Sequence, residues 1–429
     1  MSKRRKILLY LVLTTVVFLA VSLVVSCGSK NDKNGSTTVT YTSSEQAAKS
    51  TSSANAAVDL SQSMNSAAAD LTSSSPDNTY KTPGINSSTD TSSLSAIDPQ
   101  LQVFADGMLG QMKSAAVTNT ISKARAMRSA GLASAPSPTH VTITGTCSGG
   151  TGTFTITGTD TSTVTYKEYT IDIVLETCSD STNTVHSVSN GSIHVYDKEM
   201  LDNSSSNRVA NIHLTALDYD GATLKKTKIA NGDFTANESG TSTSRSGSNS
   251  ANGSYSEIVP GSGGGNQVGT FYFTNLGDQW TWDIVSNVKT VTNTMNGSFG
   301  YSIVSPTGSL KLDIALTNLQ DKVRYNNYLD PLFGSRDRWI NGSITITWSP
   351  DLSLYGCIGG TITYTTAVAT PLHYVTSLAA DKCPASGTLV INNATIVYGN
   401  PIVVTVGNDQ KTFATCSQMD NNGLCGGNN

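Results

Sequence analysis

The sequence predicts a mainly β protein: a large antiparallel meander, arranged as a sandwich, open roll or barrel, with one N-terminal amphipathic helix and a disordered tether before it. Three observations carry this prediction. From His140 to the C-terminus, apolar residues alternate with polar ones, as in strands with one buried face. Asn-Gly, the strongest two-residue hairpin signal, recurs in the same region. Large apolar residues are nearly absent between Cys27 and Ile97, which predicts the tether.

The N-terminus has the order of a secretory signal. Four basic residues at positions 3–6 precede an apolar run from Ile7 to Val25, and polar sequence begins after Cys27. Val24-Val25-Ser26-Cys27 resembles the lipobox of bacterial lipoproteins, although the family more often has Ala or Ser at the position of Val25. The resemblance implies a signal peptide over 1–26, cleavage before Cys27 and lipid, such as palmitate, on that cysteine. The alternative is an uncut signal anchor, since the apolar run is long enough to span a bilayer.

The same resemblance implies a location. Several acyl chains on Cys27 would anchor the protein stably to a membrane. Gly28, and not Asp, follows the cysteine, so the family's sorting habit favours the outer membrane, with the protein facing the periplasm or the cell surface.

Residues 27–96 and 97–131 differ in pattern. The first stretch is rich in Ser, Thr, Ala, Asn and Asp and buries too little apolar area to offset its ordering entropy, so we expect a disordered tether. In the second, Leu101, Phe104, Met108 and Met112 recur at helical spacing, with Asp98 as the expected cap. This predicts an amphipathic helix that packs on the β region or, alternatively, binds a partner or a membrane surface.

Residues 139–429 are predicted to form the antiparallel β body, with about a dozen strands. The inward positions are the apolar members of each alternating run. They are Val141/Ile143, Phe154/Ile156, Tyr169/Ile171/Ile173/Leu175, Ile193/Val195, Ala210/Ile212/Leu214/Ala216, Phe271/Phe273, Trp280/Trp282/Ile284, Phe299/Tyr301/Ile303, Leu310/Leu312/Ile314/Leu316, Ile344/Ile346/Trp348 and Ile362/Tyr364.

Turn signals divide this region. Copies of an Asn-Gly-Ser pattern begin at 252, 296 and 341, with a degenerate copy at 386, and lie 44 or 45 residues apart. We interpret this spacing as a repeated unit of three to four strands or, alternatively, as chance regularity. The Ser- and Gly-rich segment from Ser239 to Gly265 predicts an exposed loop or a seam between two β domains near 240–266. Hairpin turns are expected at Asn190-Gly191, Asn231-Gly232, Asn252-Gly253, Asn296-Gly297, Asn341-Gly342 and Asp220-Gly221.

Six cysteines follow Cys27, and an even number predicts disulfides in an oxidising compartment. We favour sequential pairs because each closes a short loop: Cys147–Cys178, Cys357–Cys383 and Cys416–Cys425. Cys147 and Cys357 each open a C-x-G-G-T sequence, which suggests two related disulfide-closed units and resembles uncharacterised β-rich lipoproteins of Gram-negative bacteria. No C-x-x-C occurs and the five histidines are scattered, so we expect no metal site.

Composition and motifs exclude several classes of function. The net charge is −4 and only 14% of residues are charged, without the basic stripe of a nucleic-acid-binding protein. No nucleophile elbow, H-E-x-x-H, P-loop or dinucleotide motif occurs, so we expect neither catalysis nor a cofactor. We interpret Asp172 and Glu176 as solvated strand charges and not as a catalytic pair. Asp218-Tyr219-Asp220-Gly221 is interpreted as a hairpin and not as a Ca²⁺ loop.

The expected role is structural or adhesive, with a surface or matrix component as partner besides the membrane. The alternative is a binding or transport module that holds a lipid or other hydrophobic ligand in a barrel or half-barrel. A third hypothesis is an enzyme whose site is assembled from separated residues. The aromatic residues of the β region could form a surface that binds a glycan or an apolar ligand, but three of the four tryptophans lie at inward positions, which favours core packing. These residues are Trp280, Trp282, Trp339, Trp348, Tyr272, Tyr301 and Tyr364.

Overall fold

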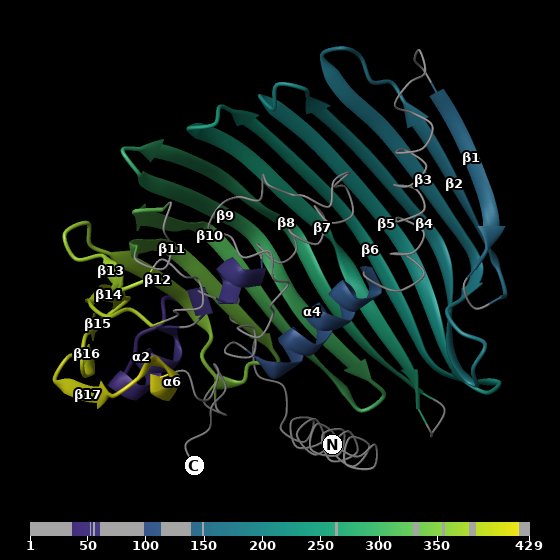
Figure 1. Ribbon diagram of the computed structural model, residues 1–429. Helices are drawn as coiled ribbons and strands as arrows, with labels where there is room; N and C mark the ends of the chain where they lie inside the picture. The colour runs from purple at the N-terminus through teal and green to yellow at the C-terminus, as the bar shows by residue number, and fades with distance from the viewer. Residues whose placement is uncertain are drawn as a thin grey trace.

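The structure is a computed structural model that describes residues 37–60 (without 52 and 55), 98–112, 139–147, 150–261, 265–328, 334–353, 357–376 and 383–419. Among these residues, seventeen strands form one antiparallel sheet that stays open (Figure 1). The prediction of a mainly β fold with an antiparallel meander is therefore confirmed, and of the architectures considered the closed barrel is wrong. The sheet holds more strands than the dozen expected.

Strands β1 to β11 pair in chain order, each with the next. β12 and β13 both pair with β11, and β14 to β17 continue from β12 as a smaller region of short strands. The strands are β1 Thr139–Thr146, β2 Thr153–Asp160, β3 Tyr166–Ser179, β4 Val185–Met200, β5 Ser205–Asp220, β6 Thr223–Gly240, β7 Ser244–Pro260, β8 Asn266–Val285, β9 Val288–Ser305, β10 Gly308–Asn326, β11 Ser335–Ser349, β12 Gly360–Thr366, β13 Leu372–Tyr374, β14 Gly387–Ile391, β15 Ala394–Tyr398, β16 Ile402–Val406 and β17 Asp409–Phe413.

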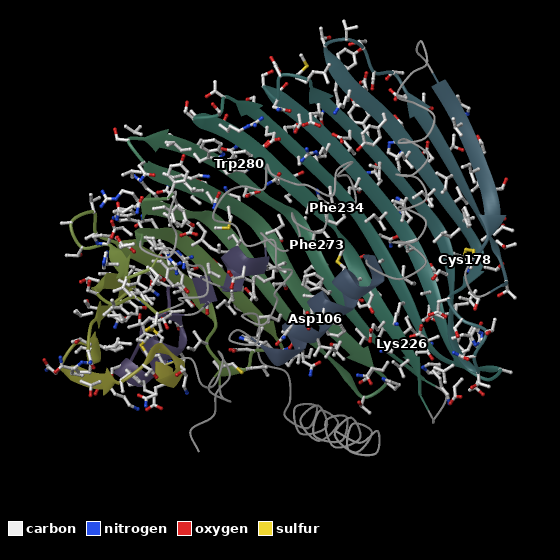
Figure 2. The ribbon with its side chains drawn as sticks, viewed as in Figure 1. Asp106, Cys178, Lys226, Phe234, Phe273 and Trp280 are labelled. Carbon is white, nitrogen blue, oxygen red and sulfur yellow. A yellow bond between two sulfur atoms is a disulfide. The ribbon has the colours of Figure 1, made fainter. Side chains whose placement is uncertain are left out.

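The two faces of the sheet differ because side chains alternate along each strand. We call the face that carries Phe234 and Phe273 the inner face and the opposite one the outer face (Figure 2). Nearly all predicted inward residues are buried, for example Ile212 and Leu214 in β5. Ile143 in β1 is an exception, with 38% of its surface exposed, because β1 pairs on one side only, with β2.

Helix α4 (Pro99–Met112) lies across the inner face (Figure 1). Asp98 caps it, since its Oδ1 accepts a hydrogen bond from Gln100 N–H at 2.7 Å. Phe104 and Met108 are buried against β6 to β9, and the Phe104 ring lies 5.7 Å from that of Tyr301. The rest of the predicted helix, 113–131, lies outside the described residues.

Residues 37–60 pack on the sheet, which corrects the prediction of a tether over this part. Val39 N–H donates to the Thr361 carbonyl at 3.0 Å, and Tyr41 is 2% exposed. The short helix α2 (Ser44–Lys49) packs against β15, β16 and β17. The prediction failed because alanines need little volume to be buried: Ala47 and Ala48 are fully enclosed, and the few larger apolar residues, such as Tyr41 and Leu60, are buried with them. The remaining predicted tether lies outside the described residues.

Five of the six predicted Asn-Gly and Asp-Gly turns are not turns. Only Asp220-Gly221 joins two strands, β5 and β6. The Asn-Gly pairs at 190, 231, 252, 296 and 341 lie inside β4, β6, β7, β9 and β11. Gly191, Gly297 and Gly342 have φ between 110° and 134° and lie opposite β-bulges of the neighbouring strands.

The asparagines of these pairs complete the bulges. Asn296 Oδ1 accepts the backbone N–H of Asn318 in β10 at 2.8 Å, and Asn252 Oδ1 accepts that of Asn275 in β8 at 2.6 Å. Copies of the pattern in β7, β9 and β11 recur every second strand. The 44- to 45-residue spacing is therefore one pair of long strands, and the prediction of three to four strands per unit is wrong.

The Ser-rich segment is also ordered. Residues 244–260 form β7, which pairs with β6 over one edge and β8 over the other. The loop interpretation is wrong, and the sheet runs without a break through the expected seam. The polar composition misled because β7 places few large apolar side chains, such as Tyr255, on the inner face.

Disulfides are present, and one of the three predicted pairs is found. Cys147 bonds to Cys178, as expected (Figure 2 labels Cys178). Cys383 bonds to Cys416, so the pairs Cys357–Cys383 and Cys416–Cys425 are wrong. Cys357 is also disulfide-bonded, with a partner outside the described residues. Spacing along the chain misled because β14 to β17 and their turns return Cys416 to the vicinity of Cys383.

Candidate binding groove on the outer face

The outer face of β3 to β8 is built from polar side chains that stand in rows across the strands. In most of these rows, neighbours bond to each other. His194 Nδ1 lies 2.7 Å from Asp172 Oδ1, and Asn211 Nδ2 donates to Asp233 Oδ1 at 2.8 Å. Such cross-strand pairs satisfy the polar groups of an exposed face.

A groove with a volume of about 570 Å³ crosses β4 to β8 at the end of the sheet where β4 ends and β5 begins. Two neighbouring rows of the outer face line it, and between them lie Ser206, Glu238, Gly247 and Trp280, at positions that alternate to the inner face. The first row, one residue per strand and directly opposite one another, is Lys198, Asn207, Asn237, Ser248 and Gln279. The second row follows in the same way with Met200, Ser205, Ser239, Ser246 and Thr281.

These two rows differ from the others in their hydrogen bonding. Asn207, Asn237, Ser248 and Gln279 make no side-chain hydrogen bond to any described residue, and neither do the hydroxyls of the second row. Asn237 and Gln279 are also exposed. Amides and hydroxyls both donate and accept, so the groove presents unused bonding capacity of both kinds.

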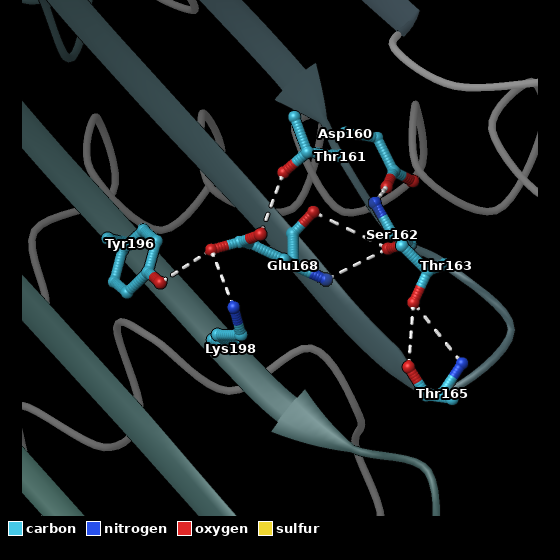
Figure 3. Close-up of polar contacts among 8 residues, drawn as sticks. All are labelled: Asp160, Thr161, Ser162, Thr163, Thr165, Glu168, Tyr196 and Lys198. Carbon is cyan, nitrogen blue, oxygen red and sulfur yellow. Dashed lines mark hydrogen bonds and ion pairs between the residues drawn. The ribbon is translucent and has the colours of Figure 1, made fainter.

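One margin of the groove is an ordered charge network (Figure 3). Lys198 Nζ lies 3.4 Å from Glu168 Oε1 and 4.1 Å from the centre of the Tyr166 ring. Tyr196 donates to Glu168 at 2.7 Å, and this bond holds the pKa of the Glu168 carboxyl below its ordinary value. Burial and the neighbouring Glu168 raise the pKa of Tyr196 to about 12. The lysine charge is therefore balanced, and the groove itself is close to neutral.

The predicted aromatic surface is mostly core. Trp280, Trp282 and Trp348 are at most 8% exposed on the inner face, as their inward positions predicted, and Tyr301 and Tyr364 are buried as well. Trp339 and Tyr272 are half-buried on the outer face, and Tyr272 donates to Asp313.

The carboxylates considered for catalysis or Ca²⁺ have separate partners. Glu176 accepts a hydrogen bond from Thr153 Oγ1 at 3.3 Å, whereas Asp172 pairs with His194. The two carboxylates therefore do not form a shared site. Asp218 pairs with Lys228 at 2.8 Å, and Asp220 lies at an ordinary hairpin. Within the described ranges, no three His, Cys, Asp or Glu side chains converge on a metal position.

The predicted lipidation site, Cys27, and Cys425 lie outside the described residues, as does the expected signal peptide. In the part of the chain that the structure describes, no helix has the length and hydropathy to span a bilayer.

Sequence reasoning missed the groove because its residues are ordinary Ser, Asn and Gln in strands. They come together only through the register of five strands, β4 to β8, one of which was read as a loop. No protein-family model matches the chain, and neither do any of the curated proteins or solved structures with which it was compared, so its role is inferred from this geometry.

Proposed function

We propose that this chain is a lipid-anchored, non-enzymatic lipoprotein of the outer membrane whose β body serves in adhesion to a surface or matrix component. The observation that carries the adhesive role is the groove in the outer face, where the side chains of Asn207, Asn237, Ser248 and Gln279 and the hydroxyls of the second row make no intramolecular hydrogen bond within the described part of the chain. An exposed face with unused donors and acceptors can exchange water for a polar partner at little cost.

The inner face supports this choice over a hydrophobic ligand. Phe104 and Met108 of α4 occupy the apolar surface of β6 to β9, and Val39, Tyr41 and Leu60 are part of the same buried cluster. Apolar area that the protein's own residues cover is not available to a lipid.

The anchor is tested separately from adhesion. Cells of a Gram-negative host expressing the full chain are labelled with palmitate, beside the variants Cys27→Ala and, as a matched control, Ser29→Ala. We expect label and cleavage before Cys27 in the wild type and in Ser29→Ala, whereas Cys27→Ala should carry no label and remain an uncut precursor. Label that persists on Cys27→Ala would refute the lipoprotein assignment.

Adhesion is tested with beads that carry the full mature chain, compared with beads that carry the same chain after reduction and unfolding. Retention of the folded chain alone on extracellular matrix or bacterial cell-wall material supports the proposal. Equal retention of both bead types would contradict it.

A further inference from the structure

The two rows of the groove form a periodic surface. Neighbouring strands of a sheet lie about 4.7–4.9 Å apart, so the five positions of the first row, from Lys198 in β4 to Gln279 in β8, extend over roughly 19 Å. From β5 to β8 each step offers one amide or hydroxyl in the first row and one hydroxyl in the second, while β4 contributes the Lys198 ammonium and the Met200 thioether.

We propose that this groove binds a linear, neutral glycan, laid across the strands with about one sugar per strand. The spacing between strands is close to the length of one sugar in an extended polysaccharide. Vicinal hydroxyls donate and accept at once, which matches Asn237, Ser248 and Gln279 and the hydroxyls of Ser239 and Ser246. The inference rests on the adhesive role proposed above and names its ligand class.

Charge and topology argue against other ligands. The charge of Lys198 is balanced by Glu168, so the groove has no cation free to attract a polyanionic chain. A peptide that extends a sheet needs an edge strand with unpaired backbone groups, whereas β4 to β8 are paired on both sides.

The floor of the groove also favours a ring-shaped unit over a bulky side chain. Lys198 and Met200 lie at one end of the two rows and Gln279 and Thr281 at the other, and the second row between them consists of the small residues Ser205, Ser239 and Ser246. Sugar rings laid along the first row therefore have room beside them, with their hydroxyls toward the serines.

The inference is tested with the full mature chain and three neutral probes, cellohexaose, mannohexaose and chitohexaose, beside hyaluronan and dextran sulfate as anionic probes. The double variant Asn237→Ala/Gln279→Ala removes two amides from the groove. Asn231→Ala/Thr274→Ala, on the same strands β6 and β8 but outside the groove, is the matched control.

We expect at least one neutral probe to bind, with affinity about tenfold or more weaker in the groove variant and unchanged in the control, since two hydrogen bonds are lost. The inference is overturned if no neutral probe binds, if the groove variant binds as well as the wild type, or if only the anionic probes bind. If beads carrying the groove variant are retained as well as wild-type beads, the glycan site is overturned and the adhesive role stands. If neither folded nor unfolded wild-type chain is retained, the adhesive role itself is overturned.

Discussion

Gly297 in β9 lies so close to Asn275 in β8 that a Cβ on the glycine would overlap the Asn275 carbonyl oxygen. Its φ of 110° also belongs to the region that side chains rarely adopt. Asn275 itself has φ 47°, and the register of β8 and β9 shifts between Thr274 and Gly277. The glycine is thus required by a bulge in the middle of the sheet.

Gly297→Ala is expected to lower the free energy of unfolding by more than about 3 kcal/mol, because backbone strain and overlap with a neighbouring strand add. Gly221→Ala is the matched control: its φ of 61° is also positive, but no atom lies within 4 Å of the added methyl. The control should cost about 1 kcal/mol. Denaturant unfolding measures both values. If the two variants lose the same free energy of unfolding, the close approach of Asn275 to Gly297 does not contribute to the cost of the substitution.

This bulge also explains why the turns were mispredicted. Asn-Gly favours hairpins because Gly adopts positive φ and Asn accepts a backbone N–H. In Asn296-Gly297 the glycine accommodates the bulge of β8 at Asn275, and the asparagine accepts the N–H of Asn318 at the bulge of β10. Local sequence contains the conformational preference, but not which neighbouring strand uses it. Alternation on both sides of each pair is expected for a hairpin and for a bulge alike, so it does not distinguish the two cases.

Phe104 anchors α4 to the sheet over Gly269, where a Cβ would overlap the phenyl ring. The ring is 7% exposed, so Phe104→Ala should lower the free energy of unfolding by about 3–5 kcal/mol. Val103→Ala, at a neighbouring position that is 55% exposed, should change it by less than about 0.5 kcal/mol. Thermal or urea unfolding, monitored by near-UV circular dichroism, tests this. If Phe104→Ala leaves the free energy of unfolding unchanged, α4 does not stabilise the sheet.

Lys289 is 2% exposed on the inner face, and burial lowers its pKa to about 8. Its Nζ donates no hydrogen bond to a described residue, although it lies 4.5 Å from the centre of the Trp282 ring, which offsets part of the desolvation. Because the folded pKa lies below the ordinary 10.5, the unfolded chain binds more protons between about pH 8 and 10.5. The contribution of this residue to stability therefore rises with pH through that window.

Lys289→Met should raise the free energy of unfolding by about 1–3 kcal/mol at pH 7, with a smaller gain at pH 10. Lys225→Met is the control, since the Lys225 side chain is 55% exposed. Urea unfolding at several pH values measures the difference. A gain that is constant from pH 7 to 10 would show that loss of the charge is not its cause.

Features that depend on neighbouring residues could be predicted from the sequence, whereas features that depend on distant segments could not. Alternation in β5 predicted the burial of Ile212 and Leu214, because consecutive side chains of a strand point to opposite faces of the sheet. The bond between Cys383 and Cys416 and the row from Asn207 to Gln279 depend on which strands are neighbours and in what register. That information lies in contacts between distant segments, which periodicity within one segment does not contain.

Residues 37–60, which the sequence assigned to a disordered tether, make specific contacts with the β body. Tyr41 is 2% exposed, and its backbone N–H donates to Asn393 Oδ1 at 2.9 Å, while its carbonyl accepts from Asn393 Nδ2 at 3.0 Å. Ser44 adds two bonds to Asp409, from its N–H at 2.6 Å and its hydroxyl at 2.7 Å. These contacts join the start of the described chain to β17 and to the turn between β14 and β15.

Tyr41→Ala should therefore lower the free energy of unfolding of the mature chain by about 3–5 kcal/mol, since it leaves a cavity the size of a phenol ring. Thr40→Ala, one residue earlier and exposed, should leave it within about 0.5 kcal/mol. Both are measured by urea unfolding with limited proteolysis in parallel, and Tyr41→Ala should expose this segment to cleavage while the disulfide between Cys383 and Cys416 stays closed. Wild-type stability in Tyr41→Ala, or rapid cleavage of this segment in the unmutated chain, would restore the original tether assignment for these residues.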